Sequence, residues 1–277
     1  MKRQLELKEI KERNLNTLVY FKNFCNAHQL RYYLAFGTLL GAVRHRGFIP
    51  WDDDIDVLMP RKDYNKLLSL TDEINNSQWE LLSFRNNSNY LFPYMKLCDR
   101  QTEVLPSRFS SGLIYGLSID IFPLDYNPGK NEKEARQICC ESRDYLSKKI
   151  RRSCVSSPRG HNGKNDIKRL VKKVIYHVGN KRDGLLAEYR KIEDQFQFVE
   201  KNEFVFYFNS SYRALWKDSS FHTSDDDCSE LTFEGEKFLA PYDYHAVLTE
   251  TYGDYMQLPP IEKRVSRHTY DAYLKDH

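Results

Sequence analysis

Four aspartates within five residues, followed by an apolar run, constrain this chain more than any other feature of the sequence. Along a strand, residues two apart project to the same face, so Asp54 and Asp56 place two carboxylates side by side. Ile55 and Val57 then face the core behind them. The pattern predicts a buried strand over about residues 54–59 that carries acidic groups on one face.

The acidic face of this strand predicts a metal site. Asp52 is in register with that face, whereas Asp53 should point away from it. Two carboxylates about 5 to 7 Å apart repel each other unless a cation or a proton lies between them. Because oxygen ligands favour Mg²⁺ or Mn²⁺ over zinc, we expect Asp52, Asp54 and Asp56 to hold one of these ions. A solvated acidic turn explains a bare Asp-x-Asp pattern equally well.

A glycine turn precedes the acidic strand. Residues 31–35 predict a strand, Gly37 breaks it, and Thr38 is expected to cap a helix that runs to about His45. Free backbone N–H groups at such a turn suit a phosphate, so we expect Gly37 and Thr38 to bind a phosphate group. Arg44 and His45 at the end of the helix are further donor-binding candidates. His45 has a second interpretation, since a histidine there also stabilises the helix C-terminus.

A third carboxylate comes from a later strand. Asp120 lies between isoleucines in the run 118–123, where an unpaired charge is costly, so we expect it to complete the metal site and take part in catalysis. The alternative is a salt bridge to a core arginine or lysine. Lys96, on the predicted strand 94–97, is expected either to pair with a donor phosphate or to be an edge lysine that reaches solvent. Asp125 is expected to cap a turn.

Polar and aromatic residues gather near the C-terminus. Tyr252, Asp254, Arg264 and His268 are candidates for lining an acceptor site or for holding a cationic group such as choline. By composition alone this segment reads only as a loop.

The charge balance excludes several classes of protein. The 277 residues include 42 basic and 39 acidic side chains, a net charge of +3 that is too small for a dedicated nucleic-acid binder. The sequence has no apolar stretch of membrane-spanning length and no secretory signal, so we expect a cytoplasmic protein. The spacing of the six cysteines fits neither a zinc site nor a disulfide framework, and free thiols are expected.

The order of predicted elements gives an α/β (α+β) fold with a mixed sheet. We expect a core over residues 1–130 and a mainly helical lobe over 131–277 whose C-terminal segment closes the active site, although one compact unit is also compatible with the pattern. Further predicted elements are helices over 3–28, 60–70, 132–152, 166–177, 183–198 and 242–252, strands over 80–84, 117–122 and 204–208, and a hairpin over 231–239.

The run from Phe36 to Asp56 resembles the signature of the LicD family of phosphotransferases, and the pattern continues in 119–125, in 252–260 and at His268. This resemblance implies a nucleotidyltransferase-like fold and transfer of phosphocholine from CDP-choline to a sugar of a teichoic acid or lipopolysaccharide. Relatives similar to fukutin-related protein use CDP-ribitol instead. The family's metal-binding carboxylates map onto Asp54, Asp56 and Asp120, and its diphosphate-holding turn maps onto Gly37 and Thr38.

The hypothesis is in-line attack by a sugar hydroxyl on the phosphorus that carries the small alcohol, with CMP leaving and Asp120 or Asp56 taking the proton. Alternatives are ribitol- or glycerol-phosphate transfer, a nucleotidyltransferase that uses ATP, an Asp-x-Asp glycosyltransferase and a catalytically inactive binding module. The basic segments 148–152 and 168–173 suggest peripheral contact with the cytoplasmic face of a membrane that carries a lipid-linked acceptor, although solvated helix faces have the same composition.

Overall fold

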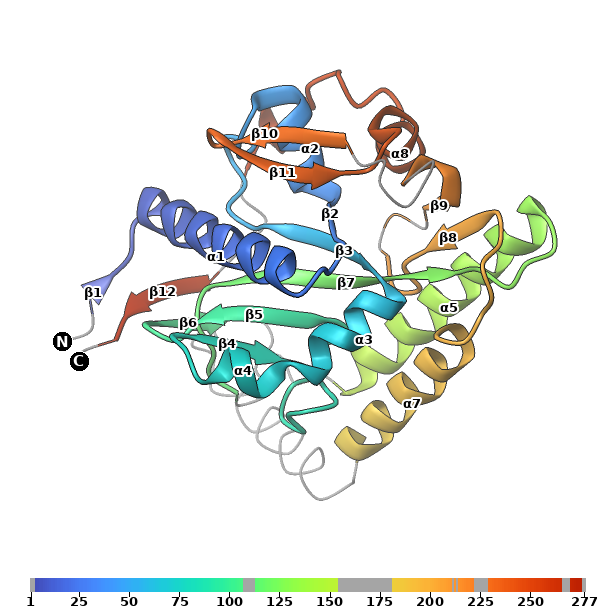
Figure 1. The fold of residues 1–277 in the computed structure, drawn as a ribbon, viewed down its shortest axis with the longest axis horizontal. Helices are drawn as coiled ribbons and strands as arrows, with labels where there is room; N and C mark the ends of the chain where they lie inside the picture. The colour runs from blue at the N-terminus through green and yellow to red at the C-terminus, as the bar shows by residue number, and fades with distance from the viewer. Residues whose placement is uncertain are drawn as a thin grey trace, which may run out of the picture.

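The computed structural model describes residues 3–106, 113–153, 181–210, 212, 214–221, 229–265 and 270–275. The predicted mixed α/β class is confirmed, because helices and strands alternate along the first half of the chain and strands of both halves share one sheet (Figure 1). Within the described residues the strands form three sheets.

The main sheet has the order β2-β3-β7-β5-β4, and β8 and β9 extend it beyond β7. β3 and β7 run parallel, and Asp56 lies opposite Asp120 in their register. The other neighbours in this sheet are antiparallel. Its strands are β2 (Tyr33–Leu34), β3 (Asp56–Pro60), β4 (Trp79–Leu82), β5 (Met95–Asp99), β7 (Ser118–Tyr126), β8 (Phe204–Phe206) and β9 (Leu215–Lys217).

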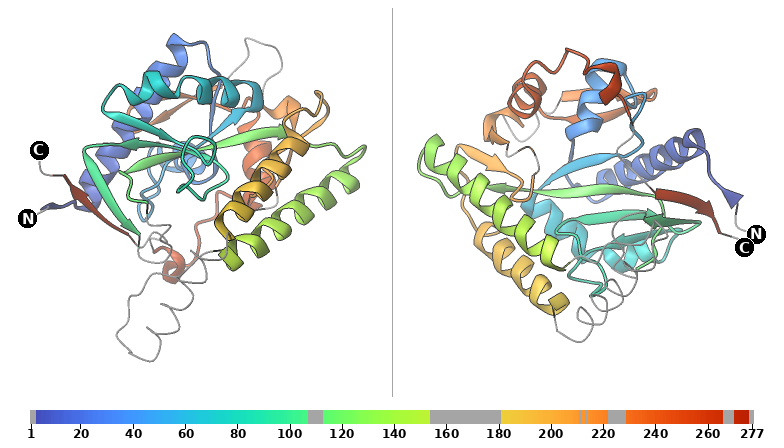
Figure 2. Two further views of the ribbon diagram at one scale, coloured as in Figure 1. Left: turned by 90° about the horizontal axis from the view of Figure 1, so that it is seen from below. Right: turned by 180° about the vertical axis from the view of Figure 1, so that it is seen from behind.

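Three helices cover one face of this sheet: α1 (Leu7–Ala27), α3 (Arg61–Ser69) and α4 (Thr71–Asn75) (Figure 2). α1 buries Leu18, Phe21 and Cys25 on one side, as the predicted amphipathic pattern requires. α3 begins directly after Pro60, as predicted.

The second half of the chain adds both helices and strands. α5 (Glu132–Ser153) packs beside α7 (Lys181–Phe196), and β8 pairs with the end of β7. Tyr189 of α7 and Phe206 of β8 belong to the same buried cluster as Ile121 of β7. The helices predicted over 132–152 and 183–198 are therefore present, and the region also extends the main sheet. The domain boundary at residue 130 stays a prediction.

The hairpin predicted around Glu234-Gly235 is confirmed as β10 (Ser229–Phe233) and β11 (Glu236–Ala240). A turn of 3₁₀ helix, η1 (Asp218–Ser220), precedes it, and α8 (Tyr244–Tyr252) and η2 (Ile261–Lys263) follow it. α2 (Phe36–His45) packs against both β10 and α8, so the top of the molecule in Figure 1 joins early and late parts of the chain.

The third sheet brings the two ends of the described chain together. β12 (Tyr270–Leu274) pairs with both β1 (Arg3–Gln4) and β6 (Thr102–Pro106), and Figure 1 shows the ends side by side. The prediction of one helix from residue 3 was wrong here, since residues 3–4 form a strand before α1 begins. β6, β9 and β12 were not predicted, because each is short and is specified by distant partners.

The prediction for Asp125 was also wrong. It does not cap a turn but lies fully buried within β7, where its two carboxylate oxygens accept hydrogen bonds of 2.6 and 2.7 Å from Arg61. Arg61 also pairs with Glu193 of α7 at 2.5 Å, and Glu193 in turn accepts a hydrogen bond from Arg85. This buried ionic network links α3, β7 and α7, so it couples the predicted core to the predicted lobe.

None of the described helices is long and apolar enough to cross a bilayer. The four cysteines in the described ranges are free thiols, as predicted. Several predictions fall outside the described residues and have no structural counterpart here: the helix over 166–177 with its basic segment 168–173, His268, Cys154 and Cys228.

Candidate active site

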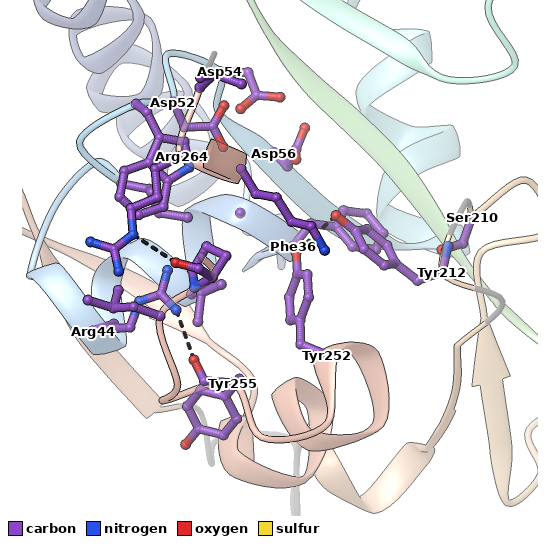
Figure 3. A pocket seen from close by; sticks show the side chains of 18 of the residues that line it. Phe36, Arg44, Asp52, Asp54, Asp56, Ser210, Tyr212, Tyr252, Tyr255 and Arg264 are labelled. Atoms are coloured by element: carbon purple, nitrogen blue, oxygen red, sulfur yellow. Dashed lines mark hydrogen bonds between the residues drawn. The ribbon is translucent and has the colours of Figure 1, made fainter. Parts of the chain in front are cut away.

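A cavity of about 1000 Å³ lies where α2, β3, β7 and α8 meet the segment 254–265. Figure 3 shows three zones in its wall: an acidic zone with Asp52, Asp54 and Asp56 at the top, an arginine zone with Arg44 and Arg264 on the left, and an aromatic wall with Phe36, Tyr212 and Tyr252 toward the right. The Tyr255 ring lies below Arg44. Asp52, Asp54, Asp56 and Asp120 all line it. The acidic residues singled out from the sequence are therefore brought together in one cavity.

The acidic zone is built at the start of β3. β3 begins at Asp56, so Asp54 precedes the strand, and the expected start at residue 54 was too early by two residues. The predicted alternation nevertheless holds, because Ile55 and Val57 are fully buried while Asp54 and Asp56 face the cavity. Asp120 lies opposite Asp56 on the neighbouring strand.

The charges in this zone are suited to a cation. Burial raises the pKa of Asp56 well above its usual value, and the charges of Asp54 and Asp120 raise it further. All donors are carboxylate oxygens, which is the ligand chemistry of Mg²⁺ and Mn²⁺. As the side chains of the described residues are placed, no three acidic, histidine or cysteine groups enclose an ion. The donor set thus fits a hard divalent cation in its chemistry, and the ion itself stays a prediction.

Lys96 lies behind the acidic zone and does not line the cavity. Its ammonium group forms a salt bridge with Asp120 and lies 5.5 Å from the centre of the Tyr94 ring. Burial lowers the pKa of Lys96, but Asp120 outweighs burial, and the pKa lies above its usual value. The edge-lysine alternative is wrong, because β5 is an inner strand and Lys96 is buried. The salt bridge considered as the alternative for Asp120 is present, and Asp120 still faces the cavity.

The turn from β2 into α2 is tied to the backbone of Asp56. Ala35 N donates to Asp56 O at 3.0 Å, and Asp56 N donates to the Thr38 hydroxyl at 2.8 Å. α2 begins at Phe36, so the predicted helix cap at Thr38 was wrong, since its hydroxyl holds β3 instead. Gly37 lines the cavity, and a Cβ on it would lie 3.2 Å from Asp52 Oδ2. The acidic zone and the predicted phosphate turn are in contact.

Asp53 points away from the cavity, as predicted. Its Oδ2 accepts a hydrogen bond of 2.8 Å from the Tyr270 hydroxyl of β12, and its carbonyl oxygen accepts one of 2.8 Å from Asn14 of α1. Residues 52–55 form neither helix nor strand. These contacts hold the loop that carries Asp52 and Asp54 from two distant parts of the chain.

The arginine zone, Arg44 and Arg264, lies to the left of the rings of Phe36, Tyr212 and Tyr252 in Figure 3. Arg44 donates to Tyr255 O at 2.9 Å and to His45 Nε2 at 3.0 Å, so that nitrogen of His45 carries no proton. Burial and the Arg44 charge lower the pKa of His45, which favours the neutral ring. Arg264 stacks over Trp51 at 5.8 Å. Arg44 and Arg264 line the cavity, and His45 does not.

Of the C-terminal residues predicted to line an acceptor or choline site, some line the cavity. Tyr252 and Asp254 line the cavity, and His268 lies outside the described residues. Sequence reasoning missed Tyr207 and Tyr212, which complete the aromatic wall. They follow β8 in a stretch without a motif, and only the strand predicted over 204–208 placed any residue of this stretch in the fold.

Residues 29–153 match the family described as LicD/FKTN/FKRP, nucleotidyltransferase domain. They are a LicD-family domain. The lipopolysaccharide cholinephosphotransferase LicD of Haemophilus influenzae is 28% identical over 276 residues, which cover 98% of this chain and 99% of that protein. Uncharacterized proteins of Rickettsia prowazekii and Rickettsia typhi are each 50% identical over 36 residues, which cover 13% of this chain and 14% and 12% of those proteins.

The LicD-family domain contains every carboxylate of the acidic zone together with Phe36 and Arg44. Tyr207, Tyr212, Tyr252 and Arg264 follow the matched residues and close the cavity from outside the domain. The similarity to the Haemophilus protein extends over both parts.

Proposed function

We propose that the protein is a phosphotransferase that moves phosphocholine from CDP-choline to a sugar hydroxyl of a lipopolysaccharide or related cell-surface glycan and releases CMP. The observation that carries this proposal is that Asp54, Asp56 and Asp120 line one cavity together with two arginines and the aromatic wall. The similarity to a lipopolysaccharide cholinephosphotransferase supports the choice of alcohol and acceptor.

The acidic zone supplies the reacting centre. A Mg²⁺ or Mn²⁺ ion held by Asp54, Asp56 and Asp120 would neutralise the donor diphosphate and the charge that develops as CMP leaves. Asp56 or Asp120 accepts the proton of the sugar hydroxyl, because both carboxylates face the cavity from neighbouring strands. Lys96 holds Asp120 in place through their salt bridge.

The arginine zone binds the nucleotide end of the donor. Burial lowers the pKa of the Arg44 guanidinium, and the nearby Arg264 charge lowers it further, so two like charges face each other there. An anionic phosphate relieves this repulsion. Gly37 has no side chain and lies beside Asp52 in the cavity wall, so it leaves room for the donor at the start of α2.

The products of the reaction distinguish the proposed function from two alternatives. A ribitol- or glycerol-phosphate transferase releases CMP from a different CDP-alcohol, and an ATP-dependent nucleotidyltransferase releases pyrophosphate. The aromatic wall beside the carboxylates favours a cationic alcohol over a polyol, because ring faces attract cations.

Because the acceptor is a lipid-linked glycan precursor, we place the protein in the cytoplasm with peripheral contact to the inner face of the membrane.

A product assay tests this function. The full chain is incubated with Mg²⁺ or Mn²⁺, a lipopolysaccharide acceptor and, in turn, CDP-choline, CDP-ethanolamine, CDP-ribitol and CDP-glycerol, and CMP is quantified. We expect CMP from CDP-choline, its loss in Asp56→Asn, and normal release in Asp72→Asn, which changes an exposed carboxylate outside the cavity. Turnover retained in Asp56→Asn, or pyrophosphate formed from ATP in place of CMP, rejects the proposal.

A further inference from the structure

We propose that Phe36, Tyr212 and Tyr252 form the subsite for the quaternary ammonium group of the donor, so that the protein selects choline by its charge as well as by its shape. This inference rests on the proposed function and goes beyond it by naming the residues that set the choice of alcohol. Tyr252 was a candidate for this role from the sequence, and Phe36 and Tyr212 were not.

The three rings form a continuous wall. Phe36 stacks on Tyr212 with ring centres 5.6 Å apart and an interplanar angle of 22°, and Tyr212 meets Tyr252 edge-on at 4.9 Å. The Tyr252 hydroxyl donates to the Tyr212 hydroxyl at 3.3 Å, which fixes the two rings relative to each other. All three line the cavity beside the carboxylates (Figure 3). The faces of such rings attract a cation without donating hydrogen bonds to it.

The carboxylates near this wall favour a cation there. Burial raises the pKa of Tyr252 well above its usual value, and the charges of Asp56 and Asp54 contribute in the same direction, so both carboxylates lie within electrostatic reach of the ring. In Figure 3 Arg44 and Arg264 lie to the left of the three rings, although Arg44 is also within electrostatic reach of Tyr252 and Lys263 lines the same cavity. This separation orients a CDP-alcohol with its anionic end toward Arg44 and Arg264 and its cationic end toward the rings.

The backbone at Phe36 holds its ring in this place. Phe36 has a φ of 44°, a left-handed value that bulky side chains rarely adopt. The conformation is imposed from both sides, because Ala35 and Thr38 are each hydrogen-bonded to the backbone of Asp56. These two contacts hold the turn that carries Phe36 against the start of β3, and Phe36 and Asp56 line the same cavity. The strain therefore couples the position of the ring to the position of a proposed metal ligand.

The test compares CDP-choline with its neutral analogue, in which carbon replaces the ammonium nitrogen and the shape is kept. We expect the wild-type protein to favour CDP-choline by about tenfold in kcat/KM, the size of one good cation–π contact. Phe36→Leu and Tyr212→Leu keep an apolar side chain but remove the ring, and in each the preference should fall toward unity, chiefly through KM for CDP-choline. Tyr242→Leu changes an exposed ring outside the cavity and should keep the wild-type preference.

Tyr212 is 41% exposed, so its variant tests the wall even where replacement of Phe36 impairs folding. A wild-type protein that uses both donors equally, or variants that keep the full preference, overturns the inference while CMP release from CDP-choline leaves the proposed function standing. No CMP from any CDP-alcohol rejects the proposed function and the inference together.

Discussion

The Tyr270 hydroxyl donates a hydrogen bond of 2.8 Å to Asp53 Oδ2, and this contact joins the last described strand to the loop that carries the acidic zone. Asp53 is thus the one aspartate of the four-aspartate run that serves as an anchor and does not line the cavity. The loop has no regular hydrogen-bonding pattern of its own, so its geometry depends on such contacts.

Tyr270→Phe removes this anchor and should weaken metal activation. A hydrogen bond to a charged group contributes about 1.5–3 kcal/mol, so we expect the Mn²⁺ concentration for half-maximal activity to rise about tenfold or more, with kcat recovered at saturating metal. Tyr273→Phe on the same strand is the control and should not change it.

Two substitutions of Asp53 test whether its side chain acts through the hydrogen bond from Tyr270 or through its charge. Asp53→Asn keeps an oxygen that accepts from Tyr270 and should retain most activity, whereas Asp53→Ala should behave as Tyr270→Phe does. Equal loss in both Asp53 variants, with Tyr270→Phe normal, would mean that the carboxylate charge and not the anchor matters.

Asp56 makes the metal-free protein sensitive to pH. Its folded-state pKa is raised above the ordinary value of 3.8, so its ionisation costs stability that is intact below that pH and is lost as pH rises through the folded-state pKa. Asp56→Asn stays neutral, so its Tm should exceed that of the wild type by a margin that grows from acidic to neutral pH. Added Mg²⁺ should raise the wild-type Tm and leave that of Asp56→Asn nearly unchanged.

Thermal unfolding of the two proteins across this pH range, without and with metal, provides the measurement. Asp72→Asn should follow the wild type throughout, since Asp72 is exposed. A constant difference in Tm between the wild type and Asp56→Asn at every pH would contradict the assignment.

The buried pair of Arg61 and Asp125 should be costly to break. Arg61→Met leaves the carboxylates of Asp125 and Glu193 buried without their shared partner, and we expect the free energy of unfolding to fall by about 3–5 kcal/mol. Arg136 pairs with Glu250 at the surface, where Arg136→Met should cost no more than about 1 kcal/mol. Urea denaturation compares the two, and similar losses would refute the role of burial.

Two glycines should respond to alanine with opposite signs. A Cβ on Gly41 would lie 2.4 Å from Gly47 O, so Gly41→Ala should destabilise the protein by about 1–3 kcal/mol and displace the loop toward the acidic zone. Gly184 lies exposed in α7 with nothing near its missing Cβ, so Gly184→Ala should stabilise by about 0.5–1 kcal/mol. Denaturation midpoints test both, and a loss of stability in Gly184→Ala would contradict the helix there.

The sequence sufficed to predict the acidic zone because its determinants are local. Strand alternation places Asp54 and Asp56 together. A charge between isoleucines is costly unless it has a partner, and this identified Asp120 as a candidate for the same site. That Lys96 pairs with Asp120 follows from the register of β5 against β7, and local patterns do not specify the register between strands distant in sequence.

The anchoring contacts of Asp53 and the aromatic wall could not be predicted from local sequence patterns either, because they too depend on pairing between distant strands. Tyr270 reaches Asp53 only because β12 pairs with β1 and β6, and Tyr212 reaches Phe36 only because β8 and β9 extend the main sheet. The left-handed backbone of Phe36 opposes its intrinsic preference and is imposed by contacts with β3. Each of these features depends on tertiary contacts that override local propensity.

The most direct test of the account follows the intact phospho-alcohol. The protein is supplied with lipopolysaccharide, metal and CDP-choline that carries deuterium in its methyl groups, and the acceptor is analysed by mass spectrometry. Deuterated phosphocholine on the glycan, with one CMP released for each group transferred, is the predicted result. CMP found on the glycan with free phosphocholine in solution would mean nucleotidyl transfer and would contradict the central claim.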